Sequence, residues 1–387
     1  MKIIDTRNAI ELDQGIRERL KELALALIDQ EKARIIIEPM ERKEGFWFGG
    51  GNMAEDDSGN FYLCGRYRNA GDSRYGTQKG TRGFELAIFK SEDRGKTFKK
   101  VKAFSKKDLS YGDREVISIE GSWLNIKSGG KSTDNARYME FYVSTEKGGV
   151  EYPEGLETFK KPGTGVWSID LIEGENAEAL EPANINLFLD SDDSRFLHIK
   201  DPFGFTNDRG DTVVGFCTHP FCWTSSNSGF AVRDGETDKI KEVNLTFFPR
   251  GYTWDVAMTR ATDFLKVPKR GILKELPHIY LIFYDGGESV RKYEEHPSAV
   301  KRPRGYSCEE IGGLAFSMDG YFPVVERLSV ELPMFVSPYG TGSSRYVSTL
   351  VTEEGIYALW QQSQNDLSQP LVINFLSNRE IDEILKG

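Results

Sequence analysis

Three acidic residues lie within or beside apolar segments of the sequence: Glu120 in SIEGSW, Asp201 in IKDPFGF and Asp255 in YTWDVAM. A carboxylate that is buried without partners costs free energy, so such acids are either paired or functional. When two carboxyl groups share a pocket, their repulsion raises the pKa of one and leaves the other ionised. Cleavage of a glycosidic bond requires such a pair. We therefore expect Asp201 to be a general acid, with Glu120 or Asp255 as its partner.

These residues also have structural interpretations. Asp201 precedes Pro202, and Asp-Pro commonly opens a turn. Arg345 could neutralise a buried acid instead of contacting a substrate. The sequence leaves both interpretations open.

Other side chains near the acids are suited to sugar binding. Aromatic rings beside them offer flat faces to a sugar ring, and the loop GRYRNAGDSRYG (65–76) carries arginines suited to bidentate contact with an anionic group. The segment 284–310 is expected to form a loop over the pocket mouth. The residues expected to bind substrate are Asn52, Arg68, Asp72, Trp123, Trp254, Tyr284 and Arg345.

A fold that brings distant segments together is needed to position these residues. Beyond the first 40 residues, Gly-rich and Asp/Asn-rich turns separate short runs of aromatic and β-branched residues, which predicts an all-β body. The strands fall into about five groups, and repeated sheets of this kind suggest a radial arrangement. When the groups are aligned on their first strands, one residue of each group takes a similar position: Asn52, Glu120, Asp201, Asp255 and Arg345. We predict a five-bladed β-propeller with these residues around its centre.

An amphipathic helix is predicted between Asn8 and Arg34, where apolar residues recur at roughly helical spacing. We therefore divide the chain into an N-terminal helical extension, residues 1–40, and a β-propeller catalytic domain, residues 41–387. A helix with one apolar stripe must cover something. It either closes the propeller or joins a second copy of the chain in a homo-oligomer.

The composition excludes several classes of partner. The 387 residues carry a net charge of −10, which would repel a nucleic acid backbone. No apolar run reaches the roughly 20 residues of a membrane helix, and the N-terminus lacks the pattern of a signal peptide, so a cytoplasmic location is expected. The four cysteines show no Cys-x-x-Cys spacing that would suggest zinc. We expect no cofactor and no metal.

The segment SEDRGKTF (91–98) has the residues of a tight turn between two strands. Asp93 and Gly95 suit the turn, and the hydroxyls of Ser91 and Thr97 can bond to its backbone. This segment resembles the Asp-box of sialidases and other propellers, with Phe98 in place of the commoner Trp. We expect Asp93 to be a turn residue and not a catalyst.

Four segments together resemble five-bladed propeller glycosidases: GNMAEDDSGNFYLCGRYR, LAIFKSEDRGKTF, IYLIFYDGG and GGLAFSMDGYFPVVERLSVELPMFVSP. The most similar group is the β-mannoside phosphorylases and hydrolases, and arabinanases and fructosidases are more distant. The resemblance implies an acidic trio on inner strands, with Asp201 in its Asp-Pro segment. Two departures are visible. Glu120 is followed by Gly121 where the phosphorylases carry Glu-Asp-Pro-Arg, and Asn52 lies where arabinanases place an Asp.

The sequence therefore predicts a glycoside hydrolase that cleaves a small oligosaccharide or glycoside by paired-carboxylate catalysis in a central pocket. A sialidase-like exo-glycosidase is the second interpretation, although the Arg-Ile-Pro entry motif of sialidases is missing from the sequence. A glycoside phosphorylase, a non-catalytic carbohydrate-binding propeller and a polysaccharide lyase are the remaining alternatives.

Overall fold

A computed structural model describes residues 12–69, 83–127, 138–160, 162–288, 310–318 and 324–386. Within these ranges the chain is mostly β, as the sequence predicted, and it has two α-helices, of which the C-terminal one was not predicted. The strands form four hydrogen-bonded sheets. The largest sheet consists of two runs of strands that are joined by a single parallel residue pair, Ile311 with Ser344. We therefore describe the strands as five groups.

The groups follow one another along the sequence, and each is antiparallel within itself. Group I contains β2 (Trp47–Gly49), β3 (Met53–Glu55), β4 (Phe61–Arg68), β5 (Glu85–Ser91) and β6 (Lys99–Ser105). Group II contains β7 (Val116–Lys127), β8 (Tyr138–Lys147), β9 (Val166–Gly174) and β10 (Asn186–Leu189). Group III contains β11 (His198–Thr206), β12 (Thr212–His219), β13 (Asn227–Arg233) and β14 (Ile240–Phe248).

The last two groups share the largest sheet. Group IV contains β15 (Met258–Lys266), β16 (Ile279–Gly287), β17 (Ile311–Met318) and β18 (Glu326–Arg327). Group V contains β19 (Ser344–Val351), β20 (Gly355–Gln362) and β21 (Leu371–Ser377). Its fourth strand, β1 (Arg34–Ile37), comes from the other end of the chain and pairs antiparallel with β21.

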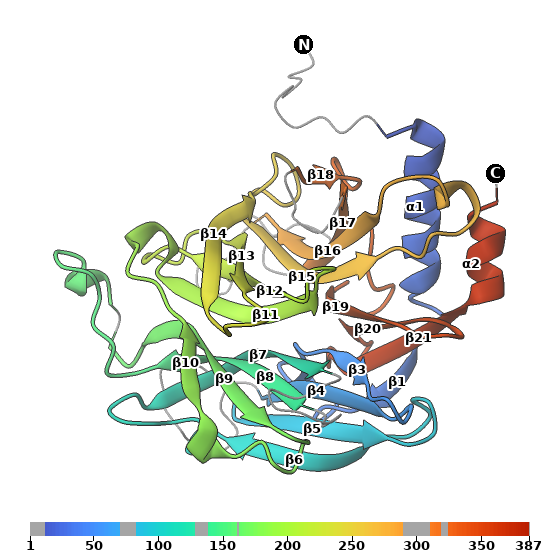
Figure 1. Ribbon diagram of the computed structural model, residues 1–387. Helices are drawn as coiled ribbons and strands as arrows, with labels where there is room; N and C mark the ends of the chain where they lie inside the picture. Colours follow the sequence, from blue (N-terminus) through green and yellow to red (C-terminus); the bar gives the residue numbers. More distant parts are fainter. Residues whose placement is uncertain are drawn as a thin grey trace.

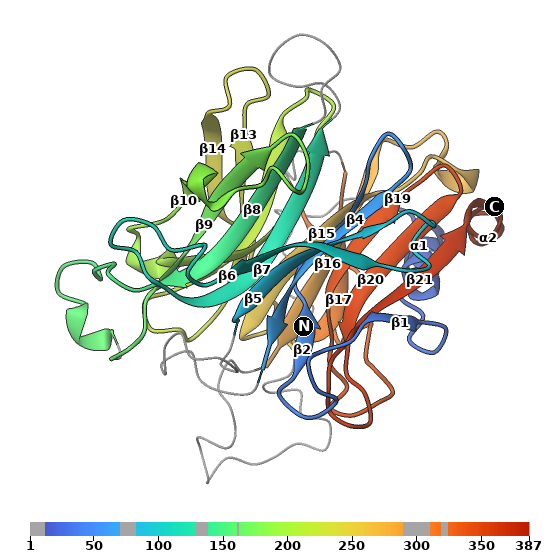
Figure 2. The same ribbon diagram turned by 90° about the horizontal axis from the view of Figure 1, so that it is seen from below.

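The groups are arranged around a common centre in sequence order (Figure 1). The inner strands of neighbouring groups touch, group I through β3, the second part of its interrupted inner strand: β3 contacts β7, β7 contacts β11, β11 contacts β15, and β15 contacts β19. The series closes, because β19 also contacts β3. Viewed from below, strands β7–β10, β13 and β14 of groups II and III lie on one side, and group V with α1 and α2 lies on the other (Figure 2).

An apolar core fills each space between neighbouring groups. Side chains of groups I and II share one cluster, II and III a second, III and IV a third, and IV and V a fourth. A fifth cluster joins group V back to group I through residues such as Phe48 and Tyr357. Middle strands such as β12 and β16 are therefore buried along their whole length, whereas the last strands, such as β14, are largely exposed. Both faces of each middle strand need apolar residues, which explains their near-continuous apolar runs.

The predicted N-terminal helix is present as α1 (Gln14–Leu27), shorter than expected from the sequence. Its buried residues, such as Leu20 and Leu27, pack with β20, β21 and α2 (Asn378–Ile384) of the same chain. Figure 1 shows the two helices side by side along group V. The apolar stripe is thus covered without a second copy, and the homo-oligomer stays an untested prediction. The boundary at residue 40 also stays a prediction, although β1 of that extension is part of group V.

No helix among the described residues is long and apolar enough to cross a bilayer.

In the turn between β5 and β6 the Ser91 hydroxyl oxygen accepts a backbone amide as predicted, whereas the Thr97 hydroxyl bonds to the Asp93 carboxylate and not to the backbone. The Asp93 carboxylate accepts bonds from the Thr97 hydroxyl (2.6 Å), the Thr97 amide (2.9 Å) and the Ser91 hydroxyl (2.8 Å). Gly95, whose φ is +76°, donates its amide to Ser91 Oγ. The donors on Thr97 and Ser91 lower the pKa of Asp93, because they stabilise its ionised form.

Replacing this aspartate should destabilise the fold in a pH-dependent way. A carboxyl whose pKa is lowered on folding stabilises the fold above its unfolded pKa of about 3.9, and this stabilisation is lost as the pH falls below that value. We expect Asp93→Ala to lower Tm by a few degrees at neutral pH and by less in acid. Thermal unfolding across pH tests this, with the exposed Asp192→Ala as control. An equal loss at every pH would contradict the account.

Candidate active site

The pairing of the innermost strands is interrupted where the five groups meet. In group I, residues 50–52 separate β2 from β3, although both strands pair with β4. In the other groups the register between first and second strand shifts at 119–122, 200–203, 261–263 and 345–348. Such bulges redirect side chains and are frequent beside active sites. Here they turn backbone and side chains of five segments toward one centre.

A pocket lies at these interruptions, with about 420 Å³ of empty space including its open mouth. Two of its lining residues, Asp201 and Tyr346, have left-handed backbones with φ of +55° and +53°. Non-glycine residues rarely adopt this conformation unless their surroundings impose it, and such strain clusters at functional sites. The lining residues are Gly50, Gly51, Asn52, Gly121, Ser122, Trp123, Asp201, Pro202, Phe203, Arg260, Ala261, Thr262, Asp263 and Tyr346.

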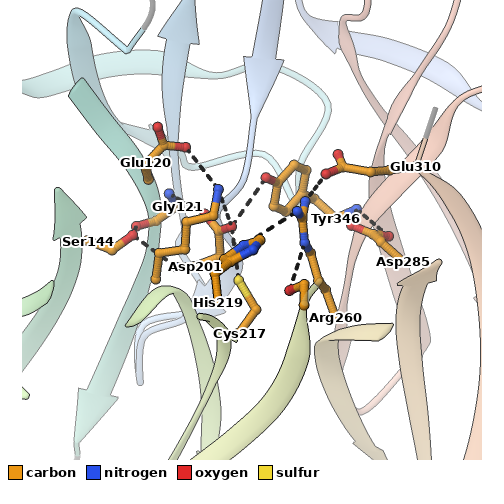
Figure 3. Close-up of polar contacts among 12 residues, drawn as sticks. Glu120, Gly121, Ser144, Asp201, Cys217, His219, Arg260, Asp285, Glu310 and Tyr346 are labelled. Atoms are coloured by element: carbon orange, nitrogen blue, oxygen red, sulfur yellow. Dashed lines mark hydrogen bonds and ion pairs between the residues drawn. The ribbon is translucent and has the colours of Figure 1, made fainter. Parts of the chain in front are cut away.

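Asp201 connects three strand groups through its hydrogen bonds (Figure 3). Its Oδ1 accepts the amide of Gly121 in group II at 2.8 Å. Its Oδ2 accepts the hydroxyl of Tyr346 in group V and the thiol of Cys217 in its own group, both at 3.5 Å. Its amide donates to Ser144 Oγ at 2.9 Å. All groups that bond to the carboxylate are donors, which is the environment of an acceptor-only, ionised acid.

Close approach explains the glycine that follows Glu120. A Cβ on Gly121 would lie 2.7 Å from Asp201 Oδ1 and 2.9 Å from its Cα, so no larger residue fits without displacing the acid.

Lys200 lies between the two acids that the sequence singled out. Its Nζ is 3.4 Å from Asp201 Oδ2 and 3.5 Å from Glu120 Oε2. Glu120 is buried and also accepts the hydroxyl of Ser118 at 3.0 Å, while Arg66 NH2 lies 3.6 Å from its Oε2. The structure therefore brings Glu120 and Asp201 together, as predicted. Glu120 is beside the pocket, and Asp201 lines it.

A second charged cluster adjoins the first. Glu310 forms ion pairs with both Arg260 and Arg345. Although burial alone would raise the pKa of Glu310, the charges of Arg345 and Arg260 hold it below its ordinary value. Asp285 accepts the amide of Tyr346 at 3.1 Å, and burial together with the charge of Glu310 raises the pKa of Asp285 well above its ordinary value.

The Tyr346 phenol faces both clusters. Its oxygen accepts Arg66 NH2 at 3.2 Å while its hydroxyl points to Asp201. Burial and the nearby charge of Asp201 raise the pKa of Tyr346 to about 12, so the phenol is protonated at neutral pH.

Asp263 is a further acid in the pocket wall. The backbone amide of Thr349 donates to its Oδ2 at 2.9 Å, and the Thr349 hydroxyl donates to the same atom. Burial nevertheless raises the pKa of Asp263 to about 7. The pocket therefore contains a carboxyl surrounded by donors, Asp201, and one whose pKa is raised to about 7, Asp263.

The expectation that Asp255 joins this pocket is wrong. Asp255 precedes β15 and is fully buried, and its Oδ2 accepts Arg327 Nε of β18 at 2.7 Å. It is not among the residues that line the pocket. The alignment failed because the bulge of the fourth inner strand lies at 261–263. The acid that group IV contributes to the pocket is Asp263.

Two aromatic residues expected to bind substrate belong to the core instead. Trp254 stacks on Tyr284, with ring centroids 5.5 Å apart, and both are buried. Trp254 Nε1 donates to the carbonyl of Ser329 at 3.0 Å, and the Tyr284 hydroxyl lies 3.1 Å from Ser329 Oγ. Neither ring lines the pocket. Their polar atoms are already paired within group IV, which suits packing rather than sugar binding.

The remaining predicted residues have mixed positions. Asn52 and Trp123 line the pocket, and the Asn52 amide bonds to both backbone groups of Leu124. The guanidinium groups of Arg68 and Arg345 both lie over the Trp47 ring, 4.1 and 3.9 Å from its centroid, and neither arginine lines the pocket. Asp72 lies outside the described residues.

Sequence reasoning missed Lys200, Arg260 and Asp263. Each is a charged residue with apolar neighbours in a predicted strand, in LHIKDPF or MTRATDFL. That signal is the same one that selected Asp201, and applying it to every strand would have found them.

Within the described ranges, no group of three His, Cys, Asp or Glu side chains is placed to hold a metal ion.

No protein-family model and no curated protein matches the sequence. The fold does match solved structures. A protein described as a glycoside hydrolase has a TM-score of 0.59 at 12% identity, over 94% of this chain and 96% of that one. An α-L-arabinofuranosidase from Lactobacillus brevis has a TM-score of 0.51 at 10% identity, over 87% and 92% of the two chains. The GH43_1 enzyme from Xanthomonas citri, complexed with xylose, has a TM-score of 0.51 at 10% identity, over 93% of both.

Protonation of Asp263 should be visible in the stability of the protein. Its pKa of about 7 lies above the unfolded value, so between about pH 4 and 7 the folded state holds a proton that the unfolded state has lost. The free energy of unfolding then falls as the pH rises through this window. Asn cannot ionise. The stability of Asp263→Asn relative to wild type should therefore rise by up to about 1.4 kcal/mol per pH unit.

Urea unfolding at several pH values within this window measures that difference. Asp192→Asn, at an exposed site, is the matched control and should show no such slope. A flat difference between wild type and Asp263→Asn would show that Asp263 is ionised in the folded protein.

Proposed function

We propose that this chain is a glycoside hydrolase whose active site is the pocket around Asp201. The observation that carries the proposal is the pair of pocket carboxyls in different environments. Asp201 is surrounded by donors, whereas burial raises the pKa of Asp263 to about 7. Glycosidic bond cleavage needs one carboxyl that gives a proton and a second that acts in its ionised form. The solved structures of similar fold include a glycoside hydrolase, an arabinofuranosidase and an enzyme complexed with xylose, which supports this reaction class.

The fold that we propose is a five-bladed β-propeller. It is supported by the five strand groups in sequence order, the closed series of contacts between their first strands, and the apolar core between each neighbouring pair. Strand β1 would complete the last blade beside β21. Joining both ends of the chain in one blade holds such a ring closed.

In the proposed mechanism, protonated Asp263 gives its proton to the oxygen of the departing sugar or alcohol. Ionised Asp201 stabilises the positive charge that develops on the sugar ring, or takes a proton from the attacking water. Trp123 and Phe203, which line the pocket, offer flat surfaces for the sugar. The sequence suggested Asp201 as the acid. Its ring of donors favours the ionised role, and Glu120 then positions Lys200 beside it.

Removal of the Asp201 charge should abolish turnover without unfolding the protein. We expect Asp201→Asn to lower kcat on aryl-glycosides by ~10²- to 10⁴-fold, because the developing positive charge loses its partner. Tm should fall by several degrees, because buried Lys200 loses a charged partner, so kcat is compared at a temperature where both proteins are folded.

A panel of aryl-glycosides, assayed with and without phosphate, measures this and separates hydrolysis from phosphorolysis. Asp192→Asn is the control and should keep full activity. Full activity of Asp201→Asn would refute the assignment. Sugar binding by the wild type without any cleavage would favour a carbohydrate-binding propeller.

The glycine after Glu120 provides an independent test of Asp201 placement. Gly121→Ala keeps the amide donor but forces its methyl group into Asp201, so kcat should fall by about 10-fold or more if a 1 Å displacement matters as it does in other enzymes. Gly148→Ala is the matched control, because its methyl group would lie at an ordinary 3.5 Å from Ile117. Equal activity of both variants would show that Asp201 tolerates displacement.

A further inference from the structure

Four rings form an aromatic cluster beside the charged centre, where β9 and β11 begin and β12 ends. The Trp223 ring centroid lies 3.7 Å from that of His219 and 4.9 Å from that of Trp167. The His198 ring completes the cluster, 5.8 Å from Trp223 and 4.9 Å from Trp167. Segments that are distant in the sequence therefore place their rings around Trp223.

The cluster adjoins the proposed catalytic acid. Lys200 Nζ lies 5.3 Å from the Trp223 ring centroid and 3.4 Å from Asp201 Oδ2. The Nε2 atom of His219 lies 3.5 Å from NH2 of Arg260, which lines the pocket (Figure 3). A ligand that took the place of the Trp223 ring would thus lie beside Lys200, which itself contacts Asp201.

Three of the rings carry buried polar atoms that are unused. Both ring nitrogens of His198, Nδ1 of His219 and Nε1 of Trp167 have no hydrogen-bond partner in the described part of the chain. The two histidines are 0% exposed and Trp167 is 8% exposed. Burial lowers the pKa of His198 to about 3 and that of His219 well below its ordinary value. Backbone groups of Phe221 and Ser225, near Trp223 in the chain, favour the protonated rings without completing a hydrogen bond.

The unused atoms include both donors and an acceptor. A guanidinium only donates, so His219 Nε2 accepts from Arg260 and Nδ1 of the neutral ring carries the proton. Trp167 Nε1 is a donor, and neutral His198 supplies one donor and one acceptor. Polar groups that are buried without partners are rare in folded proteins and destabilise them. Such a group indicates a ligand or an ordered water in the functional state.

Trp223 covers these atoms in a strained conformation. It lies in the loop between β12 and β13 and has a left-handed backbone with φ of +55°. A bulky residue rarely adopts this conformation unless its surroundings impose it. The Trp223 side chain is partly exposed, and its loop neighbours Cys222 and Thr224 are exposed, whereas the rings beneath it are buried. Movement of this one side chain would therefore open the unused atoms to a ligand.

From this arrangement we infer that Trp223 covers a second sugar-binding site, and that the sugar displaces the Trp223 ring when it binds. A sugar has hydroxyl groups that both donate and accept, which matches the unused atoms of His198, His219 and Trp167. Its apolar face packs on aromatic rings. The inference rests on the proposed function for the class of ligand, and it adds a site for a further unit of the substrate on the Lys200 side of Asp201.

Fluorine NMR of protein labelled with 5-fluorotryptophan tests the displacement. The signal that is missing from Trp223→Phe identifies Trp223. We expect this signal to shift when xylose, arabinose, mannose or their nitrophenyl glycosides are added, because the ring moves from its contact with His219 into water. The signal of Trp360, which is fully buried elsewhere, is the internal control and should stay in place. Glycerol, which has hydroxyls but no ring, is the comparison ligand.

A variant of the polar wall tests the contact. His198→Phe keeps a flat ring and removes both unused nitrogens, so the affinity for the sugar that shifts Trp223 should fall by about 10-fold. His278→Phe is the matched control, because Nδ1 of His278 is also unpaired but lies outside this cluster. Calorimetry at a temperature where all the proteins are folded measures both affinities. If His198→Phe does not fold, the NMR titration of the wild type decides the question.

The outcomes separate this inference from the proposed function. Sugars that shift the Trp223 signal without cleavage of any aryl-glycoside would support the second site and overturn the hydrolase. Cleavage of an aryl-glycoside with an unmoved Trp223 signal would support the hydrolase and overturn the second site. An equal shift with glycerol, no shift with any compound, or unchanged affinity of His198→Phe would also overturn it.

Discussion

The site depends on one constraint: where the first strands of the five groups converge, their regular pairing with the second strands breaks. An unbroken strand would point alternate side chains at its neighbours and leave no space at the centre. The shifts at 119–122, 200–203, 261–263 and 345–348 and the gap at 50–52 replace that pattern with bulged backbone and redirected side chains. The left-handed backbones of Asp201 and Tyr346 lie in these shifts. The strain in these two residues is sustained by the apolar cores between the groups.

Charged side chains at the centre of the five groups are arranged in pairs of opposite sign. Lys200 lies between Glu120 and Asp201, and Glu310 lies between Arg260 and Arg345. Positive and negative side chains therefore alternate through the buried region. Asp263 is separated from these pairs and faces the hydroxyl and amide of Thr349 instead. Burial without a neighbouring cation raises the pKa of Asp263, whereas Arg345 and Arg260 hold the pKa of Glu310 below its ordinary value. Different protonation behaviour within one pocket therefore follows from which strand carries each acid.

The sequence predicted local features better than distant ones. The turn at Asp93 was predicted because all its partners lie within six residues. The all-β body and its groups of strands were visible as apolar runs between turns. Asp201 was identified because a carboxylate within an apolar strand costs free energy unless it is paired or functional.

Pairings across the fold were not predictable. Asp255 has the same apolar neighbours as a pocket acid, yet its partner is Arg327, which lies 72 residues further along. Which acid of group IV reaches the centre depends on the position of one bulge, and the sequence signal that marks both Asp255 and Asp263 does not locate that bulge. The closing contact between β1 and β21 has a consequence for biosynthesis: β1 leaves the ribosome more than 300 residues before its partner. Until β21 follows, the last sheet has an open edge, and the nascent chain must be kept from pairing there with other chains.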